Sequence, residues 1–310
     1  MAELIRKKII LDTDIGPDCD DAGAMAVIHS LRASGEAEIL AVTHCTSSPW
    51  GAGCVDAINR YFGCPDIPVG TLKDQGFLIG EDYCRYNRHI AMNYPNRFLN
   101  EEAPDAVMIL RKVLAEHKGD GLIFISIGPF GNLKNLLLSG PDSISVLTGI
   151  ELVRESVSEL VCMGGCFANQ CEEGYLEAEF NIQIDLDAAK TVCELWPASI
   201  IFCSFEIGFG IMTGRLLKDL PERNPIKAAY TLYTPGGIRH SWDPATVFYA
   251  VRRDDLFWDI SEAGDAYVTD SGKTVWTQSA LGTRRYMIDK GKKKEAEEML
   301  DALIAYEPNC

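Results

Sequence analysis

Residues 8–22 read KIILDTDIGPDCDDA, and this stretch decides the fold. It opens with a short apolar run, which is typical of a buried strand in a parallel sheet. The ten residues from Asp12 to Asp21 then hold five carboxylates. From Asp21 to Ala33 apolar residues recur at helical spacing, and Gly35 supplies a stop. The stretch therefore predicts a strand, an acidic turn and a helix.

The same alternation continues along the chain. Further strands are predicted at residues 38–43, 122–127, 199–205, 266–269, 274–277 and 286–288 and in a run ending at Met163, and further helices at residues 55–62 and 185–195, after Pro104, after Asp243 and from Lys292. Strand–helix alternation predicts an α/β fold with a mostly parallel, Rossmann-like open sheet covered by helices on both faces. Because no repeat or linker-like stretch divides residues 1–310, we expect a single domain.

Residues 71–102 break this rhythm. They contain Gly76, Gly80, Pro95 and several tyrosines, with no clear period. Loops of this length in compact domains are usually functional lids or disordered segments. We therefore expect residues 71–102 to form an active-site lid.

The charge balance excludes some classes of partner. With 29 Lys and Arg against 45 Asp and Glu, the chain carries a net charge of −16. Phosphate binding depends on clustered basic residues, so nucleic acid and anionic membrane surfaces are not expected partners. No apolar run reaches the ~20 residues needed to cross a bilayer. The first apolar run ends at Asp12, which also argues against a signal peptide.

The 11 cysteines are scattered without CxxC pairs. Cys162, Cys166 and Cys171 cluster after a predicted strand, but no neighbouring histidine completes a zinc set. We interpret the trio as structural or incidental thiols, and a reduced cytoplasm as the location of the protein.

The acidic turn is the first candidate site. In open parallel sheets, ligands bind beyond the carboxyl ends of the strands. Five carboxylates at this density repel one another and raise several pKa values. A hard cation removes the conflict, because Ca²⁺ accepts 6–8 oxygen ligands. The alternative is an acidic loop that caps the following helix, although a cap needs only one aspartate.

The turn resembles the Asp-Thr-Asp-Pro-Gly-x-Asp-Asp-Ala motif of the inosine-uridine preferring nucleoside hydrolases. Residues 12–16 match its front and residues 20–22 its back, while the turn is two residues longer and Ile15 replaces the proline. The resemblance implies the nucleoside hydrolase fold. A short Asp-x-Asp after the first strand also opens the haloacid-dehalogenase-type phosphatases.

Three later segments are similar to further motifs of this family. They are IGPFGNL at residues 127–133, the block formed by MGG at 163–165, EAEFN at 177–181 and DLDAA at 185–189, and HSWDPA at residues 240–245. The chain departs from the family at residues 173–177, where EGYLE stands in place of a segment that usually carries an asparagine.

The resemblance implies roles for specific residues. Ca²⁺ would be held by Asp14, Asp21, Asp243 and the backbone carbonyl of Ile127, and Asp14 would activate a metal-bound water. The ribose would be held by Asp20, Glu179 and Asn181. A carboxylate and an amide two positions apart on an extended segment point the same way and suit a diol.

Several other residues are candidates without an assigned contact. On the side of the base they are His240, as the acid that protonates the leaving group, Trp242, as a stacking partner, and Tyr83, Arg88 and His89 of the lid. His240 could equally be an ordinary surface histidine. Thr46 or Ser47 stands where the family often has an asparagine, and Glu206 follows another strand end.

Together these features predict a Ca²⁺-dependent hydrolase of the N-glycosidic bond that converts a ribonucleoside to free base and ribose. The family also implies a homo-oligomer, dimer or tetramer, whereas the base and the sugar stay open. One alternative is a cation-dependent ribose or nucleoside binder without turnover. Another is a Mg²⁺-dependent phosphatase, with Asp12 as nucleophile and Asp14 as general acid.

Overall fold

The computed structural model describes residues 6–167, 178–253 and 255–308. Within these ranges a ten-stranded sheet runs in the order β11-β10-β12-β6-β5-β4-β1-β2-β3, with β9 paired to β12. Its strands are β1 Lys7–Thr13, β2 Ala37–His44, β3 Val69–Thr71, β4 Leu122–Ser126, β5 Val157–Met163, β6 Ser199–Cys203, β9 Trp258–Ile260, β10 Gly264–Val268, β11 Thr274–Gln278 and β12 Arg284–Asp289. From β12 to β3 all neighbours are parallel, which confirms the predicted sheet.

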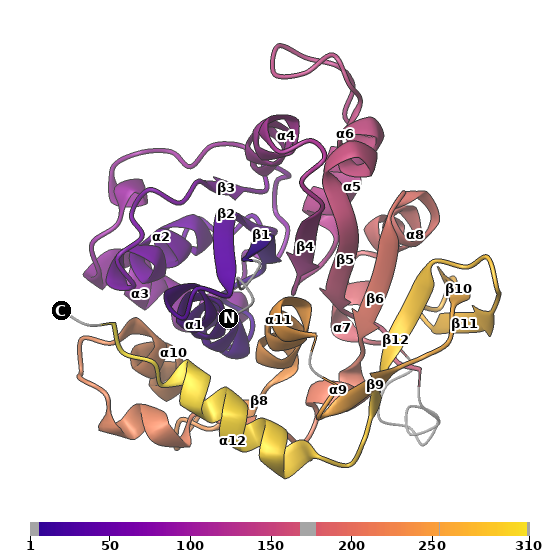
Figure 1. The fold of residues 1–310 in the computed structure, drawn as a ribbon. Coiled ribbons are helices and arrows are strands. Elements are labelled where there is room, and N and C mark those ends of the chain that lie inside the picture. Colours follow the sequence, from indigo (N-terminus) through magenta and orange to yellow (C-terminus); the bar gives the residue numbers. More distant parts are fainter. Residues whose placement is uncertain (1–5, 168–177, 254, 309–310) are drawn as a thin grey trace.

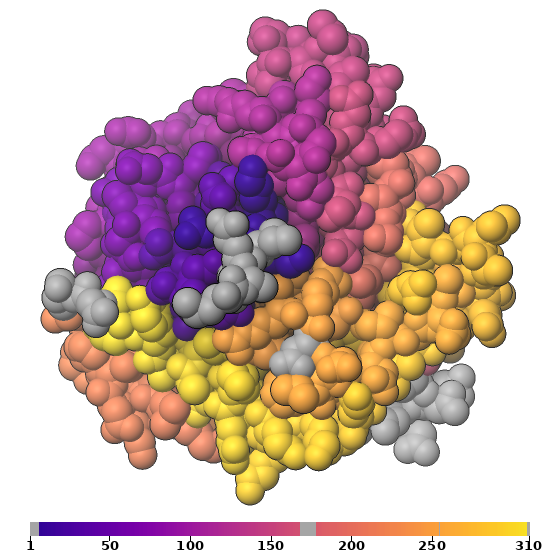
Figure 2. Space-filling view, viewed as in Figure 1, coloured from indigo at the N-terminus to yellow at the C-terminus, as the bar shows by residue number. Residues whose placement is uncertain are grey.

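Helices cover both faces of the sheet (Figure 1). One face carries α1 Asp20–Ala33, α2 Gly51–Tyr61, α3 Asn87–Asn93, α10 Pro225–Tyr233, α11 Trp242–Arg252 and α12 Lys293–Ile304, and the other carries α4 Ala106–Glu116, α5 Gly131–Leu138, α6 Gly149–Ser156 and α8 Leu186–Leu195. Side chains alternate along β1, so Ile9 and Leu11 join the first core and Ile10 the second. The C-terminal helix α12, yellow in Figure 2, packs against α1, which lies near the start of the described chain.

The edge of the sheet departs from the parallel pattern. β10 pairs antiparallel with β11 and β12, and β9 pairs antiparallel with β12. A separate antiparallel pair joins β7 Met212–Thr213 to β8 Arg239–His240. The β10–β11 connection covers only residues 269–273, a short link that an antiparallel pair allows, whereas α10 lies between β7 and β8.

Residues 71–102 are more ordered than a plain loop. They contain α3 and two single 3₁₀ turns, Glu81–Tyr83 and Arg97–Leu99. The side-chain amide of Asn87 donates to the carbonyl of Ile15 at 2.9 Å, and the Tyr86 hydroxyl donates to the carbonyl of Asp18 at 2.6 Å. The segment therefore braces the lengthened acidic turn.

The cysteine trio differs from the expectation. Cys162 is a buried free thiol, whereas Cys166 is disulfide-bonded and is therefore not the free thiol that we expected. Cys171 lies outside the described residues. Within the described ranges, no helix has the length and apolar character needed to cross a membrane.

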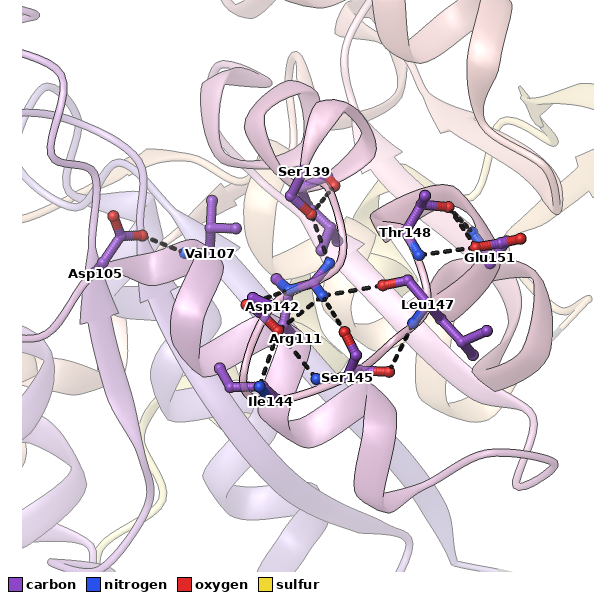
Figure 3. A network of polar contacts seen from close by, with 11 residues as sticks. Asp105, Val107, Arg111, Ser139, Asp142, Ile144, Ser145, Leu147, Thr148 and Glu151 are labelled. Carbon is purple, nitrogen blue, oxygen red and sulfur yellow. Dashed lines mark hydrogen bonds and ion pairs between the residues drawn. The ribbon is translucent and has the colours of Figure 1, made fainter.

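A buried arginine fixes the connection between α5 and α6. The Arg111 guanidinium donates to both carboxylate oxygens of Asp142, to the Ser139 hydroxyl and to the carbonyls of Ser145 and Leu147 (Figure 3). Its side chain is only 2% exposed. The hydrogen bond with Arg111 lowers the pKa of Asp142 to about 2. One side chain thus satisfies several polar groups of the loop at residues 139–148.

We expect Arg111→Ala to lower the free energy of unfolding by about 3 kcal/mol, because it removes a buried side chain and leaves several partly buried acceptors without their donor. Urea denaturation measures the loss. Lys118→Ala is the matched control, since Lys118 reaches Glu155 across 3.7 Å with both side chains about half exposed, and it should change stability by less than ~0.5 kcal/mol. Equal stability losses for the two variants would contradict the role given to Arg111.

Candidate active site

The predicted site residues other than His240 gather in one cavity of about 470 Å³ at the carboxyl ends of the strands. Its lining includes Asp14, Asp20, Asp21, Ile127, Glu179, Asn181, Trp242 and Asp243. They follow β1, β4 and β5 or lie at the start of α1 and α11. Parallel strands end at the same edge of a sheet, which is why residues more than two hundred positions apart meet here. Of the residues expected to bind metal or substrate, all lie in this lining.

The acidic turn is held in place by its own side chains. The Thr13 hydroxyl donates to Asp21 and accepts the amide N–H of Ile15 at 3.2 Å. The Asp14 and Asp21 side chains are close enough to influence each other's pKa: Asp21 lowers the pKa of Asp14, and the charge of Asp14 raises that of Asp21. The turn therefore directs the Asp14 and Asp21 carboxyls toward each other.

Asp20 joins the turn to the start of α11. Its Oδ2 atom accepts the amide N–H groups of Trp242 at 3.0 Å and Asp243 at 3.1 Å. Asp20 therefore satisfies donors at the first turn of a helix that begins 222 residues later in the chain. This contact brings the start of α11 close to the turn. One carboxylate oxygen from each of Asp20, Asp21 and Asp243 lies within 4.8 Å of the other two.

Burial dominates the electrostatics of these carboxyls. It raises the pKa of Asp14 to about 7, and it raises the pKa of Asp21 and of Asp243 well above the ordinary value of 3.8. The next cause in the last two cases is a neighbouring carboxylate, Asp14 for Asp21 and Asp20 for Asp243. The cluster therefore holds protons or attracts positive charge near neutral pH.

The donor set fits a hard divalent cation. Asp20, Asp21 and Asp243 are buried carboxylates close enough to share one ion, and Asp14 contacts Asp21. Such ions prefer carboxylate and carbonyl oxygens. The negative charge of Asp20 is already partly compensated, because two backbone N–H groups donate to its Oδ2.

The pair expected to bind ribose follows β5. Glu179 caps the short helix α7, Phe180–Gln183, and accepts the N–H groups of Asn181, Ile182 and Gly165. Burial raises the pKa of Glu179 to about 7 despite these donors. Asn181 donates to the Met163 carbonyl at 3.3 Å. The expected extended conformation is wrong, because Asn181 lies in the first turn of α7, yet both side chains still line the cavity.

Trp242 lines the cavity, whereas His240 does not. The Trp242 indole N–H donates to the Phe205 carbonyl at 2.8 Å, its ring stacks on Phe205, and it lines the cavity. His240 is not among the lining residues. Consecutive side chains of a strand point to opposite faces, so in β8 Arg239 reaches the cavity and His240 stacks on Phe209. The Nδ1 atom of His240 accepts the Gly210 N–H at 2.9 Å.

Further candidates lie away from the cavity. Thr46 hydrogen-bonds the buried His44, and Ser47 donates to the Asp74 carbonyl. Arg88 and His89 line a separate surface pocket. Of the lid residues proposed for the base, Tyr83 alone is in the cavity lining as described.

Two acids have structural contacts. Glu206 accepts the Phe167 N–H at 3.0 Å. Asp12 is fully buried under Thr43 and Asn132, which donate to its Oδ1, and it does not line the cavity. Asp12 cannot therefore reach a substrate as the phosphatase alternative requires. The departure at residues 173–177 lies outside the described residues.

A second group of lining residues was not predicted. It includes Asp18, Arg85, Phe180, Phe205, Tyr233 and Arg239. Asp18 belongs to the extra length of the acidic turn, and Arg239 directly precedes the HSWDPA segment. Their positions beside two recognised motifs could have suggested a role in the site. Their contact with each other, across 221 residues, could not be predicted from the sequence.

A family model and several solved structures resemble the chain. The family model described as inosine-uridine preferring nucleoside hydrolase matches residues 9–303. None of the curated proteins matches the chain. Among solved structures, an inosine-uridine preferring nucleoside hydrolase from Bacillus anthracis has a TM-score of 0.69 at 16% identity, covering 96% of this chain and 99% of its own. An inosine-guanosine nucleoside hydrolase has a TM-score of 0.72 at 16% identity, covering 97% and 99%.

A third similar structure is that of an effector protein. The type III effector protein XopQ, in complex with adenosine diphosphate ribose, has a TM-score of 0.71 at 15% identity and covers 98% of this chain and 94% of its own. At these identities the likeness concerns the fold.

Proposed function

The chain belongs to the inosine-uridine preferring nucleoside hydrolase family, and on that premise we propose that it hydrolyses the N-glycosidic bond of a ribonucleoside to free base and ribose with the help of Ca²⁺. One observation carries the proposal. Carboxylates from the acidic turn and from α11, together with Glu179 and Asn181 after β5, line a single cavity large enough for a small molecule.

We propose that Asp14, Asp21, Asp243 and the backbone carbonyl of Ile127 hold the cation. The closeness of Asp21 and Asp243 and the burial of all three carboxylates support this set, because uncompensated buried acids are unfavourable. When bound, the cation supplies positive charge that lowers the pKa of a water and orients the ribose diol.

Asp14 acts as the general base in this proposal. Its carboxylate takes the proton of the attacking water. Without a cation, burial raises the pKa of Asp14 to about 7, and a bound cation favours the ionised form that a base needs. The transition state resembles an oxocarbenium ion, so the surrounding carboxylates stabilise its positive charge.

The remaining contacts orient the substrate. Asp20, Glu179 and Asn181 bind the ribose hydroxyls, with the free Oδ1 atom of Asp20 as an acceptor. Trp242 offers a flat ring for the base, and its contact with Phe205 keeps that ring in one orientation.

A nucleoside panel tests the proposal. The purified protein should release free base from inosine or uridine, lose that activity in chelator and regain it when Ca²⁺ is added. Chromatography of base and ribose measures the products. Base release that is indifferent to chelator would reject the cation, and no release from any ribonucleoside would reject the hydrolase.

A binder without turnover is the second candidate. It is favoured by the likeness to XopQ, whose structure holds adenosine diphosphate ribose. Calorimetric titration of this protein with nucleosides and with adenosine diphosphate ribose, followed by chromatography of the same samples, separates the two functions. Heat of binding with no product would support the binder.

A further inference from the structure

Arg239 occupies an unusual position in the cavity lining. Its Nε atom donates to Asp18 Oδ1 at 3.0 Å and to Oδ2 at 2.9 Å, and its Nη2 atom donates to Oδ2 at 2.5 Å. Its guanidinium carbon lies 5.2 Å from the Trp242 ring centroid and 5.6 Å from that of Tyr233. One carboxylate and two aromatic rings therefore fix the guanidinium at the cavity.

The extra length of the acidic turn is what makes this contact possible. Asp18 lies between Gly16 and Asp20, in the part of the turn that is longer than the family motif. The Tyr86 hydroxyl holds the Asp18 carbonyl, and a Cβ atom at Gly16 would lie 2.3 Å from the Asn87 amide nitrogen. The longer turn is thus packed against residues 83–87 and presents Asp18 rigidly to Arg239.

The ion pair leaves one nitrogen of Arg239 without a protein acceptor. Among the described residues, no hydrogen bond involves its Nη1 atom. Burial alone would lower the pKa of Arg239, but the Asp18 hydrogen bond and charge outweigh burial and raise it. Arg239 therefore stays charged and can donate a hydrogen bond, but it cannot act as a proton donor.

The surroundings of Arg239 suit a base better than a sugar. The groups with diol chemistry, Glu179 and Asn181, belong to α7, whereas Arg239 is grouped with the rings of Trp242 and Tyr233. Nucleobases combine flat faces, which stack on aromatic rings, with carbonyl and ring-nitrogen acceptors at their edges. A fixed guanidinium beside aromatic rings matches both features.

Resting on the proposed N-ribohydrolase function, we propose that Arg239, positioned by Asp18, stabilises the departing base. As the C1′–N bond breaks, its electron pair goes to the base, whose negative charge is shared with carbonyl and ring-nitrogen atoms at its edge. The water oxygen bonds to C1′ and its proton passes to Asp14. Arg239 donates a hydrogen bond to the base anion, which then takes a proton from solvent, and Asp14 returns its proton to solvent.

This role also provides stabilisation of the leaving group, for which His240 was expected but which His240 does not reach, because it is not among the residues that line the cavity. A charge-assisted hydrogen bond that strengthens as negative charge develops lowers the barrier, because it favours the transition state over the bound substrate. Asp18 is a positioning residue in this scheme, since it acts only through the orientation of Arg239.

Two substrates with different leaving groups test the proposal. For Arg239→Gln, kcat/KM with inosine or uridine should fall about 10²–10³-fold. With p-nitrophenyl β-D-ribofuranoside it should fall less than about 10-fold, because p-nitrophenolate departs as a stable anion without assistance. Asp18→Asn should show the same selectivity with a smaller loss. Arg239→Lys keeps the positive charge but loses the planar set of N–H donors. It is the second variant to measure if Arg239→Gln folds poorly.

Arg252→Gln is the matched control. Arg252 forms a similar pair with Glu36, at 2.9 and 3.0 Å, and lies 5.2 Å from the Phe248 ring, but it does not line the cavity. Its loss should leave the ratio of the two substrates unchanged. Equal losses on both substrates for Arg239→Gln and Arg239→Lys, or no loss on nucleosides, would overturn the inference. A wild-type protein that cleaves neither substrate would overturn the proposed function and this inference with it.

Discussion

Asp14→Asn is expected to reduce kcat for base release from inosine or uridine by about 10²–10⁴-fold. The amide keeps the size of the side chain but cannot accept a proton from the attacking water. Asp14 lines the cavity, and burial together with its contact to Asp21 sets its protonation. Because Asp14 also serves as a proposed cation ligand, the assay is run at saturating Ca²⁺, so that weakened cation binding is not mistaken for a lost base.

Asp301→Asn is the control for this prediction. Asp301 is also a buried acid whose pKa is raised by burial, but it lies on α12 and accepts the Gly214 N–H outside the cavity lining. Its kcat should stay within about 2-fold of the wild type, whatever its stability. Undiminished base release by Asp14→Asn would contradict the role of Asp14 as base.

The sequence was sufficient for the parts of the site that follow local signals. The apolar runs that become β1, β4 and β5 are continuous, so the strand ends were predictable, and the residues just after them were predictable with them. Asp14 and Ile127 belong to this class, and they line the cavity because parallel strands end at one edge. Glu179 lies well beyond the end of β5, and the resemblance of its EAEFN segment to a family motif predicted it instead.

Other parts of the site depend on contacts that leave no local signal. Arg239 and His240 are adjacent in sequence, and only the pairing of β8 with β7 decides which side chain reaches the cavity. Asp18 and Arg239 meet across 221 residues. Asn181 was expected on an extended segment, but the Glu179 carboxylate caps α7 and makes that position helical. Tertiary contacts override local pattern in each case.

The buried carboxylates also predict how stability depends on pH in chelator. An acid whose pKa is raised in the folded state keeps a proton that the unfolded chain releases, so its stabilising effect is present below the unfolded pKa and is lost as the pH rises through the folded pKa. For Asp14 the rise from 3.8 to about 7 corresponds to a loss on the order of 4 kcal/mol between about pH 4 and pH 8. Chelated protein should therefore melt at a lower temperature at about pH 8 than at about pH 5.

Asp243→Asn tests whether this cluster is the cation site. Asp243 is the third buried carboxyl beside Asp20 and Asp21. Replacing it with a neutral amide removes charge repulsion, so the variant should be more stable than the wild type in chelator at about pH 8 by roughly 1–3 kcal/mol. Saturating Ca²⁺ should stabilise the wild type by about 2.7 kcal/mol at a hundredfold excess over Kd, and should have far less effect on the variant. Thermal melts at the two pH values, with chelator and with Ca²⁺, measure all of these differences. A variant that responds to Ca²⁺ as the wild type does would place the cation elsewhere, whereas opposite effects of one substitution in chelator and in Ca²⁺ are difficult to explain by a general change in packing.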